Sequence, residues 1–176
     1  MTTGAPIPVS VRAARRGMTL IEIMMALSIV ALLAASVGTA VKGSLQGYAD
    51  NGTIADMAQA SRAAASRILG EIRQADDVTS SAGQLRIYTD AGKTNGTIYQ
   101  LVSGTLQFSR LAGGVVGTAE PLVGGDGQIT VTAFTIVRAE NAVPKTLSAS
   151  IHLTLTSGTQ TYDSTFAAAV RKNQTY

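Results

Sequence analysis

The longest apolar stretch of the chain runs from Met18 to Val41, and Glu22 is the only ionisable residue in it. As a helix, these 24 residues would be about 36 Å long, which is enough to cross a hydrocarbon core of about 30 Å. The stretch therefore predicts a membrane-spanning helix. A carboxylate inside such a span is costly, so Glu22 is a candidate functional residue.

A second pattern follows the apolar stretch and has helical spacing. Apolar and small residues recur every three or four positions, and no proline occurs between Met18 and about Asp77. The positions are Ile54, Met57, Ala58, Ser61, Ala65, Ile68, Leu69 and Ile72. This stripe predicts one long helix with a weak middle, because each of the glycines at 38, 43, 47 and 52 costs about 1 kcal/mol relative to alanine. Two helices joined by a loop near Gly47 to Gly52 are the alternative.

After Asp77 the pattern changes to a period of two. Segments rich in Thr, Val, Ile and Tyr alternate with polar residues, and glycine-rich turns separate them, which predicts half-buried strands. These strands cover residues 85–89, 97–101, 105–109, 129–137, 150–156 and 161–170. Short strands with one polar face form antiparallel sheets, and one sheet face is the expected partner of the helix stripe. The predicted fold is α+β, a long N-terminal helix packed on an antiparallel β-sheet.

The same patterns divide the chain into four parts. Residues 1–17 are a polar, basic leader with Pro6 and Pro8, and residues 18–41 are the membrane-spanning half of the helix. Residues 42–77 are its amphipathic half, and residues 78–176 form a β-rich globular domain. Basic residues before a span keep that end in the cytoplasm, so we expect the globular domain outside the cytoplasmic membrane.

Charge and cysteine content narrow the function classes. The net charge of +3 comes from the leader, because removing Arg12, Arg15 and Arg16 leaves 11 basic against 11 acidic side chains. The remaining basic residues are scattered, so we predict no specific nucleic-acid partner. The absence of cysteine excludes a disulfide framework, a thiol nucleophile and a cysteine-based metal site.

Other kinds of N-terminal segment fit the sequence less well. A secretory signal has a shorter apolar region followed by a small-residue cleavage site, for which Ala34-Ala35-Ser36 is a loose match. A plain signal anchor explains the span and its basic flank. It does not explain a glycine at position 17 together with a glutamate at position 22.

The junction Arg15-Arg16-Gly17-Met18-Thr19-Leu20-Ile21-Glu22 resembles the class III signal of type IV pilins and of the pseudopilins of type II secretion. The resemblance implies that a prepilin peptidase cuts after Gly17 and methylates the new N-terminus at Met18, where phenylalanine is usual. Glu22 would then be the fifth residue of the mature chain. The resemblance also implies that its carboxylate pairs with the N-terminal amine of a neighbouring subunit during assembly.

The globular half is similar to a narrower group. Its segments resemble the J-type minor pseudopilins and the PilW-like minor pilins, although the acidic and tryptophan-rich features of many J-type proteins are missing. The matching segments are Leu69-Gly70-Glu71-Ile72-Arg73-Gln74-Ala75, Ile98-Tyr99-Gln100-Leu101, Leu106-Gln107-Phe108-Ser109-Arg110 and Phe166-Ala167-Ala168-Ala169-Val170-Arg171-Lys172-Asn173.

We predict no catalytic residue, no metal site and no cofactor. His152 is the only histidine, and its phase in an alternating strand predicts a solvent-facing side chain. Asp76 and Asp77 fall at the expected helix end and predict an exposed loop or cap pair. Asp126 lies in Gly124-Gly125-Asp126-Gly127, where turn formation is the better interpretation.

Together these patterns predict a structural subunit of a type II secretion pseudopilus or a type IV pilus. The implied partners are the prepilin peptidase, other pseudopilins or pilins, the inner-membrane assembly platform and the membrane itself. The implied location is the inner membrane, with a periplasmic globular domain. A membrane-anchored binding domain outside any filament is the alternative. An anchored enzyme is disfavoured because no catalytic constellation is present.

Overall fold

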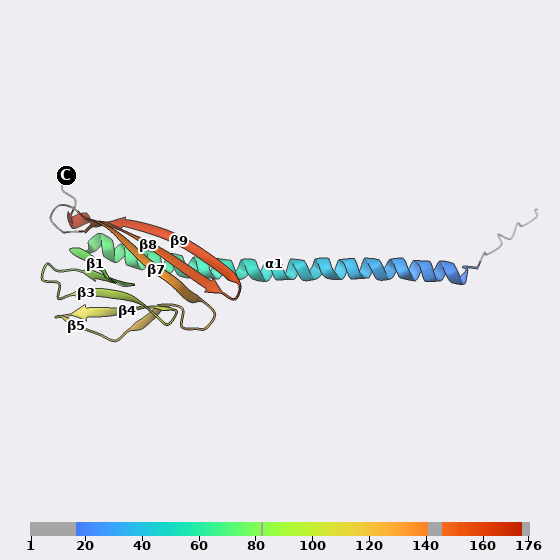
Figure 1. Cartoon of the computed structure of the whole chain (residues 1–176), viewed down its shortest axis with the longest axis horizontal. Helices are drawn as coiled ribbons and strands as arrows, with labels where there is room; N and C mark the ends of the chain where they lie inside the picture. The colour runs from blue at the N-terminus through green and yellow to red at the C-terminus, as the bar shows by residue number, and fades with distance from the viewer. Residues whose placement is uncertain (1–16, 82, 141–145, 174–176) are drawn as a thin grey trace, which may run out of the picture. The chain divides into compact units, whose positions relative to one another are not determined.

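The computed structural model describes residues 17–81, 83–140 and 146–173 (Figure 1). One long helix is followed by strands and a final short 3-10 helix. The elements are α1 (Leu20–Gln74), β1 (Asp77–Ser81), β2 (Gln84–Tyr88), β3 (Gly96–Val102), β4 (Thr105–Ala112), β5 (Val115–Val116), β6 (Glu120–Val123), β7 (Thr130–Glu140), β8 (Thr146–Ser157), β9 (Gln160–Ala169) and η1 (Arg171–Asn173).

The α1 helix is continuous over 55 residues, so the two-helix alternative is wrong. Its four central glycines do not break it, since no proline removes a main-chain donor there. The chain nevertheless divides into two compact units at a point inside this helix. One unit reaches Gln46, and the other begins at Gly47 and contains all the strands.

The predicted antiparallel pairing is confirmed, but the strands form two sheets instead of one. In the first sheet the order is β1-β2-β3-β4-β5, with β6 also paired to β4, and in the second it is β7-β8-β9. All six predicted strands are present. The sequence patterns did not reveal β1, β5 and β6, which have two to five residues each.

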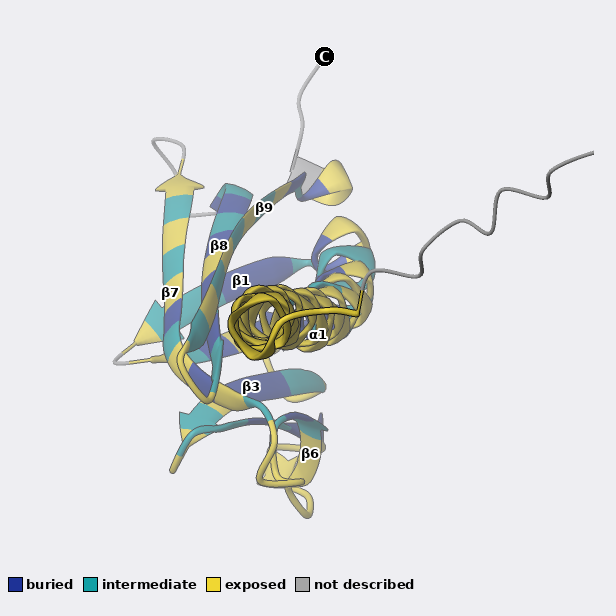
Figure 2. Ribbon diagram, turned by 90° about the vertical axis from the view of Figure 1, so that its right-hand side faces the viewer, coloured by how far each residue is buried: buried dark blue, intermediate teal, exposed yellow. Residues whose placement is uncertain are grey.

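The helix stripe packs against both sheets in one core. The α1 residues Met57, Ala64, Ile68 and Ile72 join a buried cluster with side chains from β1 to β4 and from β6 to β9. Figure 2 shows this core in dark blue between the strands and the helix. The predicted burial is wrong for Ile54, which is 36 % exposed. Ala64, which lies outside the predicted stripe, is buried.

Polar contacts tie the elements of the globular unit together. The hydroxyls of Ser61 on α1 and Ser164 on β9 lie 2.6 Å apart. The two sheets meet at the Val78 carbonyl of β1, which accepts hydrogen bonds from Thr146 Oγ1 at 2.6 Å and Arg138 Nη1 at 2.9 Å. These bonds join the outer strand of the first sheet to the β7-β8 pair.

Charged side chains of α1 also cover part of the first sheet. The Arg67 guanidinium lies 3.6 Å from the centre of the Phe108 ring, and its Nε is 3.6 Å from Glu71 Oε1. Tyr99 is fully buried beside Phe108. Burial raises the pKa of the Tyr99 hydroxyl above its usual value, and the nearby Glu71 carboxylate raises it further.

Candidate functional site

The candidate site lies where α1 begins. Gly17, Met18 and Thr19 precede the helix, and all three are exposed. An exposed peptide bond outside regular structure is accessible to a protease, because its main-chain groups are not held in a helical ladder. The Gly17–Met18 bond has this placement. The rest of the predicted leader, residues 1–16, lies outside the described residues.

The first turn of α1 contains a capping box. Thr19 is the residue before the helix, and Glu22 stands three positions later, the T-x-x-E spacing typical of this motif. Glu22 N donates to Thr19 Oγ1 at 3.4 Å, and Thr19 N donates to Glu22 Oε2 at 3.5 Å. Glu22 therefore has hydrogen-bond partners within the first turn of its own helix. The T-x-x-E spacing was the signal in the sequence for this contact.

This contact places the Glu22 carboxylate beside the residue that follows Met18. An acidic side chain in the first turn also interacts favourably with the positive end of the helix dipole. Gly17, Met18, Thr19 and Glu22 thus lie within six consecutive residues of the chain. The site thus has two parts. One is the accessible Gly17–Met18 peptide bond, and the other is the Glu22 carboxylate, which lies close to the main-chain N–H of Thr19.

The helix beyond this turn has an exposed apolar surface on all sides. No residue from Leu20 to Ala49 is buried, and the first turns of α1 are yellow in Figure 2. The large apolar side chains exposed here are Leu20, Ile21, Ile23, Met24, Met25, Leu27, Ile29, Val30, Leu32, Leu33, Val37, Val41 and Leu45. Within the described residues, α1 is the one helix long and apolar enough to cross a membrane.

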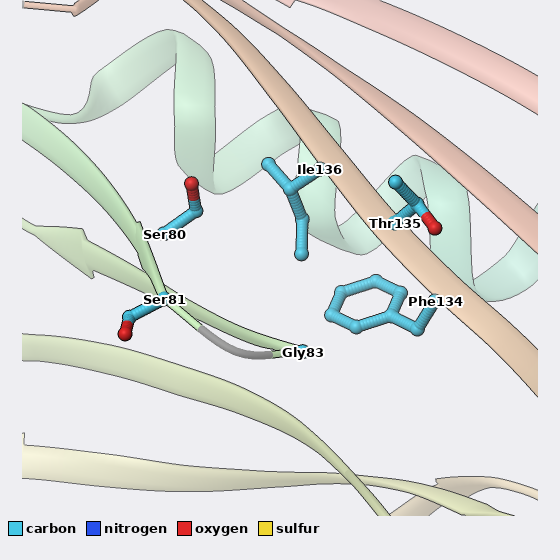
Figure 3. Close-up of a pocket in the computed structure, with 6 residues that line it drawn as sticks. All are labelled: Ser80, Ser81, Gly83, Phe134, Thr135 and Ile136. Atoms are coloured by element: carbon cyan, nitrogen blue, oxygen red, sulfur yellow. The ribbon is translucent and has the colours of Figure 1, made fainter.

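The globular unit has small surface cavities of a different character. Figure 3 shows one between the end of β1 and the middle of β7, with a volume of about 240 Å³. Its lining residues are Ser80, Ser81, Gly83, Phe134, Thr135 and Ile136. This cavity has hydroxyl groups but no acid, base or metal ligand among its lining side chains. It therefore offers no arrangement for acid–base chemistry.

The other residues that the sequence singled out lie in strands and turns of the globular unit. His152 is exposed as predicted, with Nε2 3.9 Å from Asp163 Oδ1. Asp126 Oδ1 accepts hydrogen bonds from the main chain at Gln128 and Ile129, so its interpretation as a turn residue is confirmed. No group of three or more His, Cys, Asp or Glu side chains that could hold a metal ion occurs in the described part of the chain.

Asp77 is not the exposed cap residue that its position suggested. It is the first residue of β1, and it is only 6 % exposed. Its carboxylate accepts hydrogen bonds from Lys93 Nζ at 2.7 Å and from Thr146 N at 3.4 Å. The helix ends three residues earlier, at Gln74, and Asp76 N donates to the Tyr88 carbonyl. The pair of aspartates therefore begins the first sheet.

Comparison with known proteins concerns the same N-terminal segment. Residues 12–38 match the family described as "Prokaryotic N-terminal methylation motif". The matched segment contains Gly17, Met18 and Glu22 and all but the last three residues of the apolar stretch. No curated protein and no solved structure matches the chain. Residues 12–38 thus carry the N-terminal methylation motif that identifies a class III signal of the type IV pilin-like kind.

Proposed function

We propose that the protein is a minor pseudopilin or minor pilin, cleaved after Gly17, methylated at Met18 and assembled through α1. The methylation motif at residues 12–38 is the observation that carries this proposal. An exposed junction before the helix supports it, as does the apolar helix surface from Leu20 to Ala49, where no residue is buried. Such a surface suits a segment that exchanges lipid for neighbouring helices, where Ala and Gly allow close approach.

In this proposal Glu22 sets the register of assembly. Cleavage creates an α-amino group on Met18, next to the Thr19 amide that the Glu22 carboxylate already approaches. A carboxylate and an amine that leave water together must pair, because either one alone in an apolar surrounding costs several kcal/mol. A neighbouring subunit that is out of register would leave both charges unpaired. The carboxylate thus selects one arrangement of adjacent helices.

The test compares Glu22→Leu with Glu22→Gln in membranes of cells that express the partner subunits. Both variants should insert and be cleaved, since Gly17 and the basic leader are unchanged. Intact mass should give a chain that begins at Met18 and carries one methyl group. Cross-linking to pilin-like partners should fall strongly in both variants, because neither side chain can neutralise an amine.

Two results would contradict the proposal. A mature chain that begins anywhere other than Met18 would exclude the processing step. Full cross-linking and full activity of a cleaved Glu22→Leu protein would leave the carboxylate without a role in assembly. The anchored binding domain would then be the better explanation.

The proposed J-type or PilW-like character concerns the finer assignment within this class. It rests on the resemblance of Leu69–Ala75 and of Phe166–Asn173 to those groups. Genes for a secretin and a secretion ATPase beside this gene would support the pseudopilus. Genes for pilus retraction or DNA uptake in their place would support the pilus.

A further inference from the structure

Sheet edges in the globular unit differ in how they are protected. Proteins blunt exposed edges with short strands, proline, bulges, charged side chains or covering contacts. In the first sheet β5 has two residues, and β6 contains Pro121 and pairs with β4 through a register shift. The other edge of that sheet, β1, is bridged at its Val78 carbonyl. Each of these strands carries at least one protecting feature.

In the second sheet the two edges are unlike each other. The β7 strand has two register shifts and carries the Arg138–Glu140 ion pair. The β9 strand pairs with β8 at ten consecutive positions without a shift. It contains no proline, lysine or arginine, and Asp163 is its single charge. Among the described strands, β8 is the one strand partner of β9.

We propose that the free edge of β9 is a docking site for an extended segment of another protein, which adds to the β7-β8-β9 sheet as a fourth strand. The partner is an extended strand because a row of main-chain N–H and C=O groups is satisfied in full only by another such row. Side chains at alternate positions then decide which segment binds.

A second copy of this chain is a poor occupant of the edge. Asp163 is the single charge of β9, so the same strand of a second copy offers no cation to it. In an antiparallel β9–β9 pair, a register that sets the two Asp163 carboxylates opposite each other is destabilised by repulsion between like charges.

The outer face of β9 specifies a basic residue in the partner. Asp163 lies on this face with its side chain 61 % exposed, and Thr154 Oγ1 donates to it from β8. Among the described residues, the one ion-pair contact of Asp163 is with His152 Nε2 at 3.9 Å on the β8 side, and none is formed toward the free edge. Opposite charges directly across two strands attract, so a lysine or arginine opposite Asp163 favours binding.

The inner face of β9, which is turned toward α1, specifies apolar residues in the partner strand. Tyr162 and Phe166 alternate with the exposed residues of β9 and are half-buried, and Tyr162 packs against the core. The contact between Ser61 and Ser164 places α1 beneath β9. Leu69 lies on the helix flank opposite Arg67, away from the first sheet, and is partly buried. An added strand would extend the apolar cover over this flank.

The test uses the full chain in detergent micelles and a synthetic peptide. The peptide copies residues 148–156 with lysine in place of Thr154, because β8 already pairs with β9 and has Thr154 opposite Asp163. The control peptide has proline in place of Ile151 and Leu153, which removes main-chain donors. The lysine peptide should bind saturably and the proline peptide should not. Amide exchange should slow in β9 more than in β7.

Charge variants of the protein separate specific docking from non-specific adhesion. Asp163→Lys should weaken binding of the lysine peptide by up to about fivefold, the upper range for one cross-strand charge pair. A peptide with glutamate in place of lysine should recover that loss. Thr135→Lys is the control for the added lysine, because it places one on the exposed face of β7, two strands away.

Several outcomes would overturn the proposal. These are no binding of the lysine peptide, equal binding of the proline peptide, protection centred on β7, or an equal effect of Asp163→Lys and Thr135→Lys. Concentration-dependent self-association that slows exchange in β9 without peptide would identify a second copy as the occupant and would also overturn it. The assay needs neither cleavage nor filament assembly, so its result is independent of the proposed function.

Discussion

Lys93 Nζ lies 2.7 Å from Asp77 Oδ2, and this ion pair holds the loop between β2 and β3 to the first residue of β1. The carboxylate is nearly inaccessible, whereas the lysine side chain is half exposed. Burial raises the pKa of Asp77, but hydrogen bonds from Lys93 and from the main chain at Val78 and Thr146 lower it by more. Its pKa therefore lies below the ordinary value of 3.8.

Asp77→Ala should lower the free energy of unfolding by about 1–3 kcal/mol at neutral pH, because partners of a buried carboxylate lose their acceptor. A lowered folded-state pKa gives stability that is present above the ordinary carboxyl pKa and is lost as the pH falls through the lowered value. The difference between parent and variant should therefore shrink below about pH 4. Denaturant titrations of the full chain in detergent at several pH values measure it.

Lys93 sets the upper end of the pH range over which the ion pair stabilises the fold. Its hydrogen bond to Asp77 raises the pKa of Lys93 above 10.5. That stability is present below the ordinary lysine pKa and is lost as the pH rises through the raised value. The exposed Asp163→Ala variant is the control and should show little change in either range. An equal loss in both variants, or a difference independent of pH, would contradict this account.

Arg138→Met should loosen the junction between the two sheets. Arg138 donates to the Val78 carbonyl and to Ser80 Oγ and pairs with Glu140 at 2.6 Å. We expect a loss of about 1–3 kcal/mol from these partly buried bonds. Amide exchange should become faster in β1 and β7 first. Arg86→Met, at an exposed arginine bonded to Gln84, is the control and should leave exchange in β1 and β7 unchanged.

The burial of the α1 stripe sets an order of stability losses. Ile68 is 2 % exposed, so Ile68→Ala should cost about 2–5 kcal/mol. Leu69 is only partly buried, so Leu69→Ala should fall below that range, and Ile54→Ala should have the smallest effect. Unfolding followed by near-ultraviolet circular dichroism gives the three values. A loss at Ile54 as large as that at Ile68 would mean that the N-terminal part of the stripe is covered.

Among the glycines that the structure describes, Gly96 has the least room for a side chain. Its φ is 158°, and an added Cβ would lie 2.0 Å from the Ile87 carbonyl oxygen. Gly96→Ala should therefore cost about 3 kcal/mol or more, because the β2–β3 pairing must shift. Gly113→Ala is the control. Its φ of 57° carries a strain of about 1–2 kcal/mol, but an added Cβ meets no atom within 4 Å. Equal losses would contradict a steric cause.

Sequence patterns predicted the helix and the long strands well because these elements have many residues in phase. The three missed strands lack that length, and β1 begins with an aspartate immediately after a helix, where a cap is the usual interpretation. The division of the strands into two sheets could not be predicted from the alternation of apolar and polar residues. That alternation indicates which side chains of a strand are buried, but not which strands pair with it. Asp77 was misassigned for a similar reason, because its lysine partner lies 16 residues further along the chain.

The candidate site was more accessible to sequence reasoning than the core. Gly17, Met18, Thr19 and Glu22 form a pattern of spacing along one chain, so the junction is visible without any tertiary contact. The Thr19–Glu22 contact was missed although its spacing was visible. The β9 edge could not have been identified in this way. Its lack of protection is apparent only from comparison with the other edges of the folded unit.

The burial of Tyr99 gives the protein an optical reporter of its own core. The chain has five tyrosines and no tryptophan, so its near-ultraviolet spectrum arises mainly from tyrosine. Burial and the neighbouring Glu71 carboxylate raise the pKa of Tyr99, so its hydroxyl keeps its proton well above the ordinary tyrosine range. A late step in tyrosinate absorbance would record the opening of the core without any label.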